Sequence, residues 1–223
     1  MKVRGGKLAM KKPDLIVFDL DGTLIDSRRD IAWSINAMRS SFGLPELPEA
    51  TVVSFIGNGA RTLVERALAE CQVDMDEAFR RYRKFYAGHL TVFTRLYPGV
   101  DAGLRNLRKN GIKLAVGTNK SEDSTLEILE CLGIKELFDG VCGGDAGVPL
   151  KPAPDSLLAF KERFGAEECW MFGDNYTDIE AGRRAGFFRV FAGYGFGNAK
   201  EEIPDLTVDS FAELVDAALN AAR

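Results

Sequence analysis

Histidine and cysteine are both scarce in this 223-residue sequence, which contains one histidine and four widely separated cysteines. A single histidine excludes a histidine-rich zinc site and argues against a serine–histidine–aspartate hydrolase. The cysteines form no Cys-x-x-Cys pair and no dense framework, a usage typical of reduced thiols in a cytoplasmic protein. None is followed by arginine six positions later, so a thiolate phosphatase loop is absent.

Long apolar runs and an excess of positive charge are missing as well. No stretch approaches the ~20 apolar residues that span a bilayer, so we expect no membrane segment. The net charge is −4, which does not favour a nucleic-acid partner. Basic residues cluster at Met1–Lys12 and Arg80–Lys84, and we interpret both clusters as solvated faces. The first cluster lacks the apolar core of a secretory signal, and Met10 is a second candidate for the initiator.

The order of apolar segments predicts an α/β protein. The composition, 46% hydrophobic and 28% charged, is that of an ordinary globular protein, and the length fits one domain with an insertion. Strands and helices alternate along residues 97–223, which predicts a doubly wound parallel sheet with helices on both faces. The predicted strands are 14–19, 112–116, 138–142, 169–172 and 187–191, and the predicted helices are 100–109, 122–132, 154–164, 177–185 and 210–221.

Residues 27–96 have a different character, because their apolar residues follow helical spacing and show no strand-like alternation. The predicted helices here are 30–42, 50–56, 62–71 and 76–86, and we expect the single histidine, His89, to be exposed at the end of the last one. The sequence therefore predicts a core made of 1–26 and 97–223, interrupted by a helical cap at 27–96. In such a core, ligands bind beyond the carboxyl ends of the strands.

The first candidate site residues follow the first predicted strand. Asp19 and Asp21 are two positions apart, so side chains in an extended segment would face the same way. Gly22 allows the backbone to turn and lie close to a ligand. One carboxylate would act as a nucleophile and the other as a general acid and base. The alternatives for such a pair are a chance occurrence, a helix cap, or the metal-binding pair of a glycosyltransferase.

The second group, Thr118-Asn119-Lys120, follows the next predicted core strand. The hydroxyl and the neighbouring amides at a strand end suit a phosphate oxygen. Capping of the following helix explains the same residues equally well. For Lys120 a solvated side chain carries more weight, because most lysines are exposed.

Two further groups lie later in the chain. Lys151 stands in a Lys-Pro-Ala-Pro segment and would neutralise phosphate charge, although an exposed lysine before a helix is the simpler interpretation. Asp174 ends the strand at 169–172 and suits Mg²⁺, which prefers hard oxygen ligands. Asp178, one helical turn later, would orient a metal-bound water or Lys151, or would simply stabilise a helix N-terminus.

Taken together, these groups resemble the haloacid dehalogenase-like (HAD) hydrolase superfamily over nearly the whole chain. The resemblance implies that Asp19 is the phosphorylated nucleophile and a Mg²⁺ ligand. Asp21 would be the acid and base, with its backbone carbonyl also on the metal, which makes carbon–halogen cleavage unexpected. The remaining implied roles are phosphate binding for Thr118, Asn119 and Lys151, Mg²⁺ binding for Asp174, and support of the site by Gly22 and Asp178.

Within the predicted cap, the segment 55–68 is similar to the phosphoglycolate phosphatase subgroup. This similarity implies that Gly57, Asn58 and Arg61 approach the substrate when the cap closes, although Arg61 fits an exposed helical arginine equally well. One departure is Asn175-Tyr176-Thr177, where that subgroup more often has a serine and a charged residue before Asp178.

The expected activity is Mg²⁺-dependent hydrolysis of a small phosphate monoester through an aspartyl-phosphate. The expected partner is a small phosphorylated metabolite, with phosphoglycolate favoured by resemblance and pyrophosphate, a nucleotide or a sugar phosphate open. A sugar-phosphate mutase of the same architecture is the main alternative. A receiver-like signalling module, which also gathers acids, a threonine and a lysine around Mg²⁺, is less favoured. A monomer and a homodimer both remain open.

Overall fold

The computed structural model describes residues 10–222 and contains a central six-stranded parallel sheet. The strand order is β5-β4-β1-β6-β7-β8, which confirms the predicted doubly wound sheet. The strands are β1 Leu15–Phe18, β4 Lys113–Gly117, β5 Gly140–Cys142, β6 Cys169–Gly173, β7 Phe188–Ala192 and β8 Leu206–Val208. The sequence reading missed β8, because three residues are too few to show alternation. Most of the basic cluster Met1–Lys12 lies outside the described residues.

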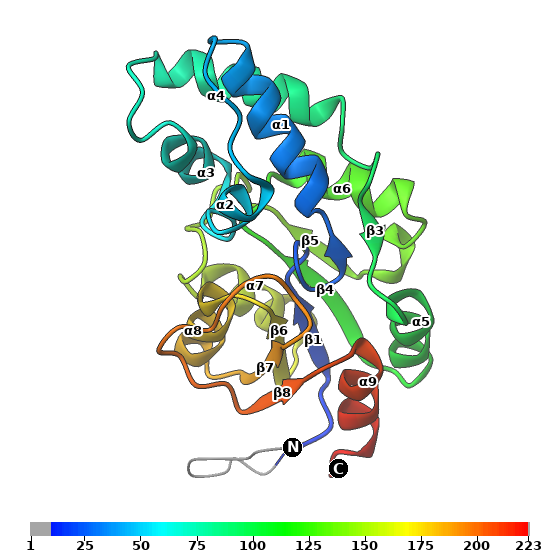
Figure 1. The fold of residues 1–223 in the computed structure, drawn as a ribbon. Coiled ribbons are helices and arrows are strands. Elements are labelled where there is room, and N and C mark those ends of the chain that lie inside the picture. The colour runs from blue at the N-terminus through cyan, green and yellow to red at the C-terminus, as the bar shows by residue number, and fades with distance from the viewer. Residues whose placement is uncertain (1–9, 223) are drawn as a thin grey trace.

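Helices cover both faces of this sheet because alternate residues of each strand point to opposite sides. Ile16 and Phe18 of β1 belong to an apolar cluster with α5, α6 and α9, whereas Leu15 and Val17 pack with α7 and α8. Figure 1 shows α5 and α9 on one side of the sheet and α7 and α8 on the other. The helices are α5 Val100–Lys109, α6 Glu122–Cys131, α7 Asp155–Phe164, α8 Tyr176–Ala185 and α9 Phe211–Asn220, with a short 3₁₀ turn at Lys135–Leu137.

The helical block between β1 and α5 stands over the end of the sheet where β1 finishes (Figure 1). Its helices are α1 Arg28–Ser40, α2 Glu49–Val53, α3 Ala60–Ala67 and α4 Met75–Ala87. A two-stranded antiparallel ribbon of β2 Ile25–Asp26 and β3 Arg95–Leu96 joins it to the core. The sequence reading missed this ribbon, since two-residue strands have no period. We propose that the cap begins after residue 26 and ends at 96. The ribbon pairs the two places where the chain passes between core and cap, residues 25–26 and 95–96.

Asp30 fastens the returning chain to the first turn of α1. Its buried carboxylate accepts hydrogen bonds from the backbone N–H of Phe93 at 3.0 Å and from the backbone N–H and hydroxyl of Thr94, both at 2.7 Å. His89 Nδ1 lies 2.8 Å from Asp30, and its ring stacks on Trp33 with centroids 3.9 Å apart. The expectation that His89 is exposed is therefore wrong, because these two contacts leave its side chain 14% exposed.

Within residues 10–222, no helix combines the length and the apolar character needed to cross a bilayer.

Candidate active site

The candidate residues from separate strand ends line one cavity of about 730 Å³. The parallel register sets Phe18 of β1 beside Val116 of β4 and Phe172 of β6, so the residues that follow these strands meet at one edge. The predicted site residues that line the cavity are Asp19, Asp21, Thr118, Asn119 and Asp174 from the core and Gly57, Asn58 and Arg61 from the cap. Lys151 and Asp178 are not part of this lining, and Lys151 contacts both Asp19 and Asp178.

Lys151 is buried between two of the predicted carboxylates. Its Nζ lies 2.8 Å from Asp19 Oδ1 and 2.6 Å from Asp178 Oδ1. Burial disfavours the charged amine, but the charges of Asp178 and Asp19 outweigh this, and the pKa of Lys151 is raised above its ordinary value. Asp178 thus contacts Lys151, and we propose that it orients this lysine. It also accepts a hydrogen bond from the backbone N–H of Asn175 at 3.0 Å and caps the N-terminus of α8, which is another of the alternatives that the sequence offered.

Three buried aspartates, Asp19, Asp174 and Asp178, form a candidate metal centre. One oxygen of each lies within 4.8 Å of the others. Burial raises the pKa of Asp174 well above its ordinary value, and the charges of Asp19 and Asp178 raise it further. Three carboxylates beside the single ammonium of Lys151 leave an excess of negative charge. A small divalent cation fits this oxygen donor set and would relieve the repulsion.

Backbone segments close around Asp174 and explain why glycine stands next to the site. The carboxylate accepts hydrogen bonds from the backbone N–H groups of Phe196 and Gly197 at 3.0 and 2.6 Å. Gly22 has φ +82°, and a Cβ at that position would overlap the Asp174 carboxylate. The 193–197 loop was not among the predicted site residues, since backbone donors leave no signature in side-chain chemistry.

Asp21 is held apart from the aspartate cluster. Its Oδ1 accepts a hydrogen bond from the Ser27 hydroxyl at 2.5 Å, and both of its oxygens accept from Lys120 Nζ, at 3.0 and 2.8 Å. The interpretation of Lys120 as a solvated lysine is wrong, because its side chain is 7% exposed. Each aspartate of the Asp-x-Asp pair thus has its own lysine, Lys151 for Asp19 and Lys120 for Asp21.

The loop after β4 connects the core to the cap. The side chain of Asn119 donates to the backbone carbonyls of Lys151 and Gly57, both at 2.9 Å, and accepts from the Lys151 backbone N–H at 2.8 Å. Thr118 is buried, and its hydroxyl accepts from the Lys120 backbone N–H at 3.3 Å. We therefore assign the Asn119 side chain to positioning Lys151, and propose that its backbone amide and the Thr118 hydroxyl bind phosphate.

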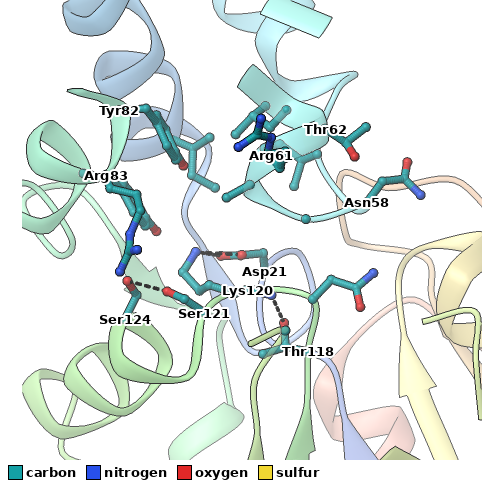
Figure 2. Close-up of a pocket in the computed structure, with 18 of the residues that line it drawn as sticks. Asp21, Asn58, Arg61, Thr62, Tyr82, Arg83, Thr118, Lys120, Ser121 and Ser124 are labelled. Atoms are coloured by element: carbon teal, nitrogen blue, oxygen red, sulfur yellow. Dashed lines mark hydrogen bonds and ion pairs between the residues drawn. The ribbon is translucent and has the colours of Figure 1, made fainter. Parts of the chain in front are cut away.

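The cap supplies the side of the cavity opposite Asp21 and Thr118, as Figure 2 shows. Asn58 Nδ2 donates to the Tyr176 hydroxyl at 2.8 Å, and Asn58 Oδ1 accepts from Arg66 at 2.9 Å. Arg61 is half-exposed and pairs with Asp76 at 2.8 Å. Tyr176 belongs to the segment 175–177, whose sequence departs from the pattern of the phosphoglycolate phosphatase subgroup. One residue of this unusual segment therefore contacts the cap.

Comparison with known proteins agrees with this geometry. The profile of the family described as haloacid dehalogenase-like hydrolase matches residues 16–192. The chain belongs to that family. It is 39% identical to a phosphoglycolate phosphatase from Chromobacterium violaceum over 95% of this chain and 99% of that protein. A phosphoglycolate phosphatase from Aquifex aeolicus is 37% identical over 90% of this chain and 94% of its own length.

Solved structures of this family have the same arrangement of sheet and cap. The crystal structure of a predicted phosphoglycolate phosphatase from Haemophilus somnus superposes with a TM-score of 0.88 at 34% identity, covering 93% of this chain and 98% of the other. The family resemblance inferred from Asp19, Thr118, Lys151 and Asp174 is therefore confirmed. The buried aspartate cluster is typical of the metal site of this family.

Proposed function

We propose that this protein is a Mg²⁺-dependent phosphatase that hydrolyses a small phosphate monoester through an aspartyl-phosphate. The observation that carries the proposal is the pairing of Asp19 with buried Lys151 beside two further carboxylates, Asp174 and Asp178. Asp19, Asp174 and the Asp21 backbone carbonyl would hold Mg²⁺, which would supply positive charge to the phosphoryl oxygens when bound. Asp178, through Lys151, supports the site.

The first step would be attack of an Asp19 carboxylate oxygen on phosphorus. A bond forms between that oxygen and phosphorus while the bond from phosphorus to the leaving oxygen breaks. Asp21 gives its proton to the leaving oxygen, which departs as an alcohol. Lys151 and the Thr118 hydroxyl would balance the charge on the phosphoryl oxygens, so catalysis depends mainly on positioning and electrostatics.

The second step would be hydrolysis of the aspartyl-phosphate. Asp21, now ionised, takes a proton from water, whose oxygen attacks phosphorus and releases inorganic phosphate from Asp19. Ser27 and Lys120 both hold the Asp21 carboxylate in place, which suits a group that must serve two steps from one position. The cap closes the cavity above it and would exclude bulk water during the reaction.

The substrate we favour is 2-phosphoglycolate, because relatives named phosphoglycolate phosphatase match this chain over nearly its whole length. The cavity is lined by Gly57, Asn58 and Arg61 of the cap, and we propose that these residues contact the leaving group. A small phosphorylated metabolite is therefore the expected partner.

A panel of phosphate esters assayed with Mg²⁺ tests the proposal. We expect steady release of inorganic phosphate over many turnovers, fastest with 2-phosphoglycolate, and loss by roughly 10³-fold or more in Asp19→Asn. Asp216→Asn, an exposed position on α9, is the control and should retain full activity. Isomer formation without phosphate release would favour a mutase, and a single stable phosphorylation without turnover would favour a receiver-like module. Substantial activity in Asp19→Asn would exclude this aspartate as nucleophile.

A further inference from the structure

Lys120 is a buried cation of the cavity that the steps above use only to hold Asp21. Its Nζ contacts both Asp21 oxygens, and Figure 2 shows the two side chains meeting on the floor of the cavity, below the cap. The lysine side chain is 7% exposed and that of Asp21 is 12% exposed. A lysine rarely lies this deep unless paired, and Asp21 supplies that pair. Because Lys120 also lines the substrate cavity, its ammonium can meet a bound substrate as well.

The other basic side chains that line the cavity are less suited to contact a group near the leaving oxygen. Arg61 pairs with Asp76 at 2.8 Å, and Arg80 pairs with Glu77 at 2.6 Å. Arg83 and Lys84 are exposed on α4. Lys120 alone among these five contacts the proposed general acid.

The surroundings of Lys120 strengthen its attraction for negative charge. The Tyr86 ring of α4 lies 4.7 Å from its Nζ, and Tyr82 stacks on Tyr86 with centroids 5.7 Å apart. Both tyrosines are buried, so the cap covers the ammonium with aromatic surface. Charges interact more strongly in such a setting than in water.

We propose that Lys120 is a specificity-determining residue that binds a negatively charged group carried by the leaving group, next to the leaving oxygen. The inference rests on the proposed phosphatase function. The acid Asp21 must come within about 3 Å of the leaving oxygen, and Lys120 Nζ lies 2.8 Å from Asp21. A carboxylate separated from the leaving oxygen by one carbon therefore falls within reach of Lys120.

Binding of such a substrate would redistribute the contacts of Lys120. The ammonium has three N–H donors, so it can bind the incoming carboxylate while keeping one contact to Asp21. Asp21 remains tied by the Ser27 hydroxyl and can point one oxygen at the leaving oxygen. An uncharged leaving group would leave the ammonium with Asp21 as before. The preferred class is thus a phosphate ester of a 2-hydroxy acid.

Two esters of similar size separate this role from a merely structural one. In 2-phosphoglycolate a carboxylate stands where ethyl phosphate has a methyl group. In Lys120→Met we expect KM for 2-phosphoglycolate to rise roughly 10- to 100-fold, the loss of one charge-assisted hydrogen bond. KM for ethyl phosphate should change less than about threefold, while kcat falls by the same factor on both esters. Lys120→Arg keeps the charge and should retain most of the preference.

The controls keep the two proposals distinguishable. Lys109→Met, at an exposed position on α5, should match the wild type on both esters, and thermal unfolding reports whether each variant is folded. If Lys120→Met does not fold, Lys120→Gln provides the same comparison. An equal rise in KM for both esters, or none for either, would overturn the role of Lys120 while leaving the phosphatase intact. If the wild type releases phosphate from no ester, the phosphatase proposal itself fails and this inference fails with it.

Discussion

The core and cap sides of the cavity hold their charged groups in different ways. On the core side, Lys151 is 3% exposed and its ion pairs join residues more than 25 positions apart in sequence. On the cap side, Arg61 is 50% exposed and pairs with Glu65 one turn later on α3 and with Asp76 of α4. Salt and water screen a buried ion pair only weakly. An exposed ion pair is screened more and contributes little to the stability of the fold. We therefore expect the charges of the core to be preorganised for chemistry and those of the cap to be freer to rearrange around a substrate.

The attachments of the two sides differ as well. Sheet register fixes the core groups, because Asp19 and Asp174 each follow a hydrogen-bonded strand. The cap loop around Asn58 is held to the core by two side-chain hydrogen bonds, one donated by Asn119 to the Gly57 carbonyl and one donated by Asn58 to the Tyr176 hydroxyl. A few such bonds are individually weak enough to open and close during a catalytic cycle. Substitutions on the two sides should consequently differ in kind and in size.

The largest effect is expected from Lys151→Met. The change leaves Asp19 and Asp178 buried without their common cation and removes a positive charge from the phosphoryl site. We expect kcat to fall by roughly 10²- to 10³-fold, the loss seen when one preorganised charge donor is removed. Initial rates of phosphate release with saturating Mg²⁺ and substrate measure this.

The matched control for that variant is Lys161→Met, a partly buried lysine on α7, the helix that follows Lys151. It should keep the wild-type kcat. A Lys151→Met enzyme within tenfold of wild type would show that the core is not preorganised through this lysine, and the contrast between core and cap would lose its main support.

An intermediate effect, on stability and not on chemistry, is expected from Asp30→Asn. The substitution replaces one of the oxygens that bind Phe93, Thr94 and His89 by an NH₂ group, which cannot accept their hydrogen bonds. We expect the free energy of unfolding to fall by about 1.5–3 kcal/mol, as for hydrogen bonds to a buried charged group. Denaturant titration measures this, with Asp216→Asn as the exposed control.

The activity of Asp30→Asn, measured at temperatures below its unfolding midpoint, sharpens the comparison between core and cap. Since Asp30 lies at the junction of cap and core, kcat at low temperature should stay within about threefold of wild type if the core chemistry is independent of cap anchoring. A large fall in kcat without loss of stability would mean that this anchor tunes the chemistry directly.

The core side of the site could be read from the sequence far better than the cap side. Asp19, Thr118 and Asp174 end apolar strands, and parallel strands carry their ends to one edge, so local pattern and topology agree. Lys151 was different, because its residues alone favoured an exposed lysine, whereas the structure buries it, and only the family resemblance pointed to a role in the site.

The parts that could not be predicted depend on distant partners. Lys120 was interpreted as solvated because nothing near it in sequence shows that its ammonium pairs with Asp21, 99 positions away. His89 was expected to be exposed because it follows the end of a cap helix, and nothing near it in sequence shows its contact with Asp30 of α1. The ribbon β2–β3 and strand β8 are two or three residues long, so tertiary pairing alone defines them.

The smallest effect is expected from Tyr176→Phe, which removes one hydroxyl from the contact between core and cap. That hydroxyl accepts from Asn58 Nδ2 at 2.8 Å, while the ring keeps its position under Lys200, whose Nζ lies 3.6 Å from the ring centroid. One hydrogen bond contributes about 0.5–1.5 kcal/mol, so KM for the substrate should rise roughly 2- to 10-fold with kcat nearly unchanged.

A double-mutant cycle with Asn58→Ala decides whether this effect belongs to the contact itself. If the hydrogen bond holds the cap closed over the substrate, the double variant should be no worse than Asn58→Ala alone, because the second change removes nothing that remains. Arg66 still contacts the Phe55 carbonyl in both variants, so the fold of the loop is preserved. Additive rises in KM would show that Tyr176 and Asn58 act separately, and the cap would then owe its closed position to Asn119.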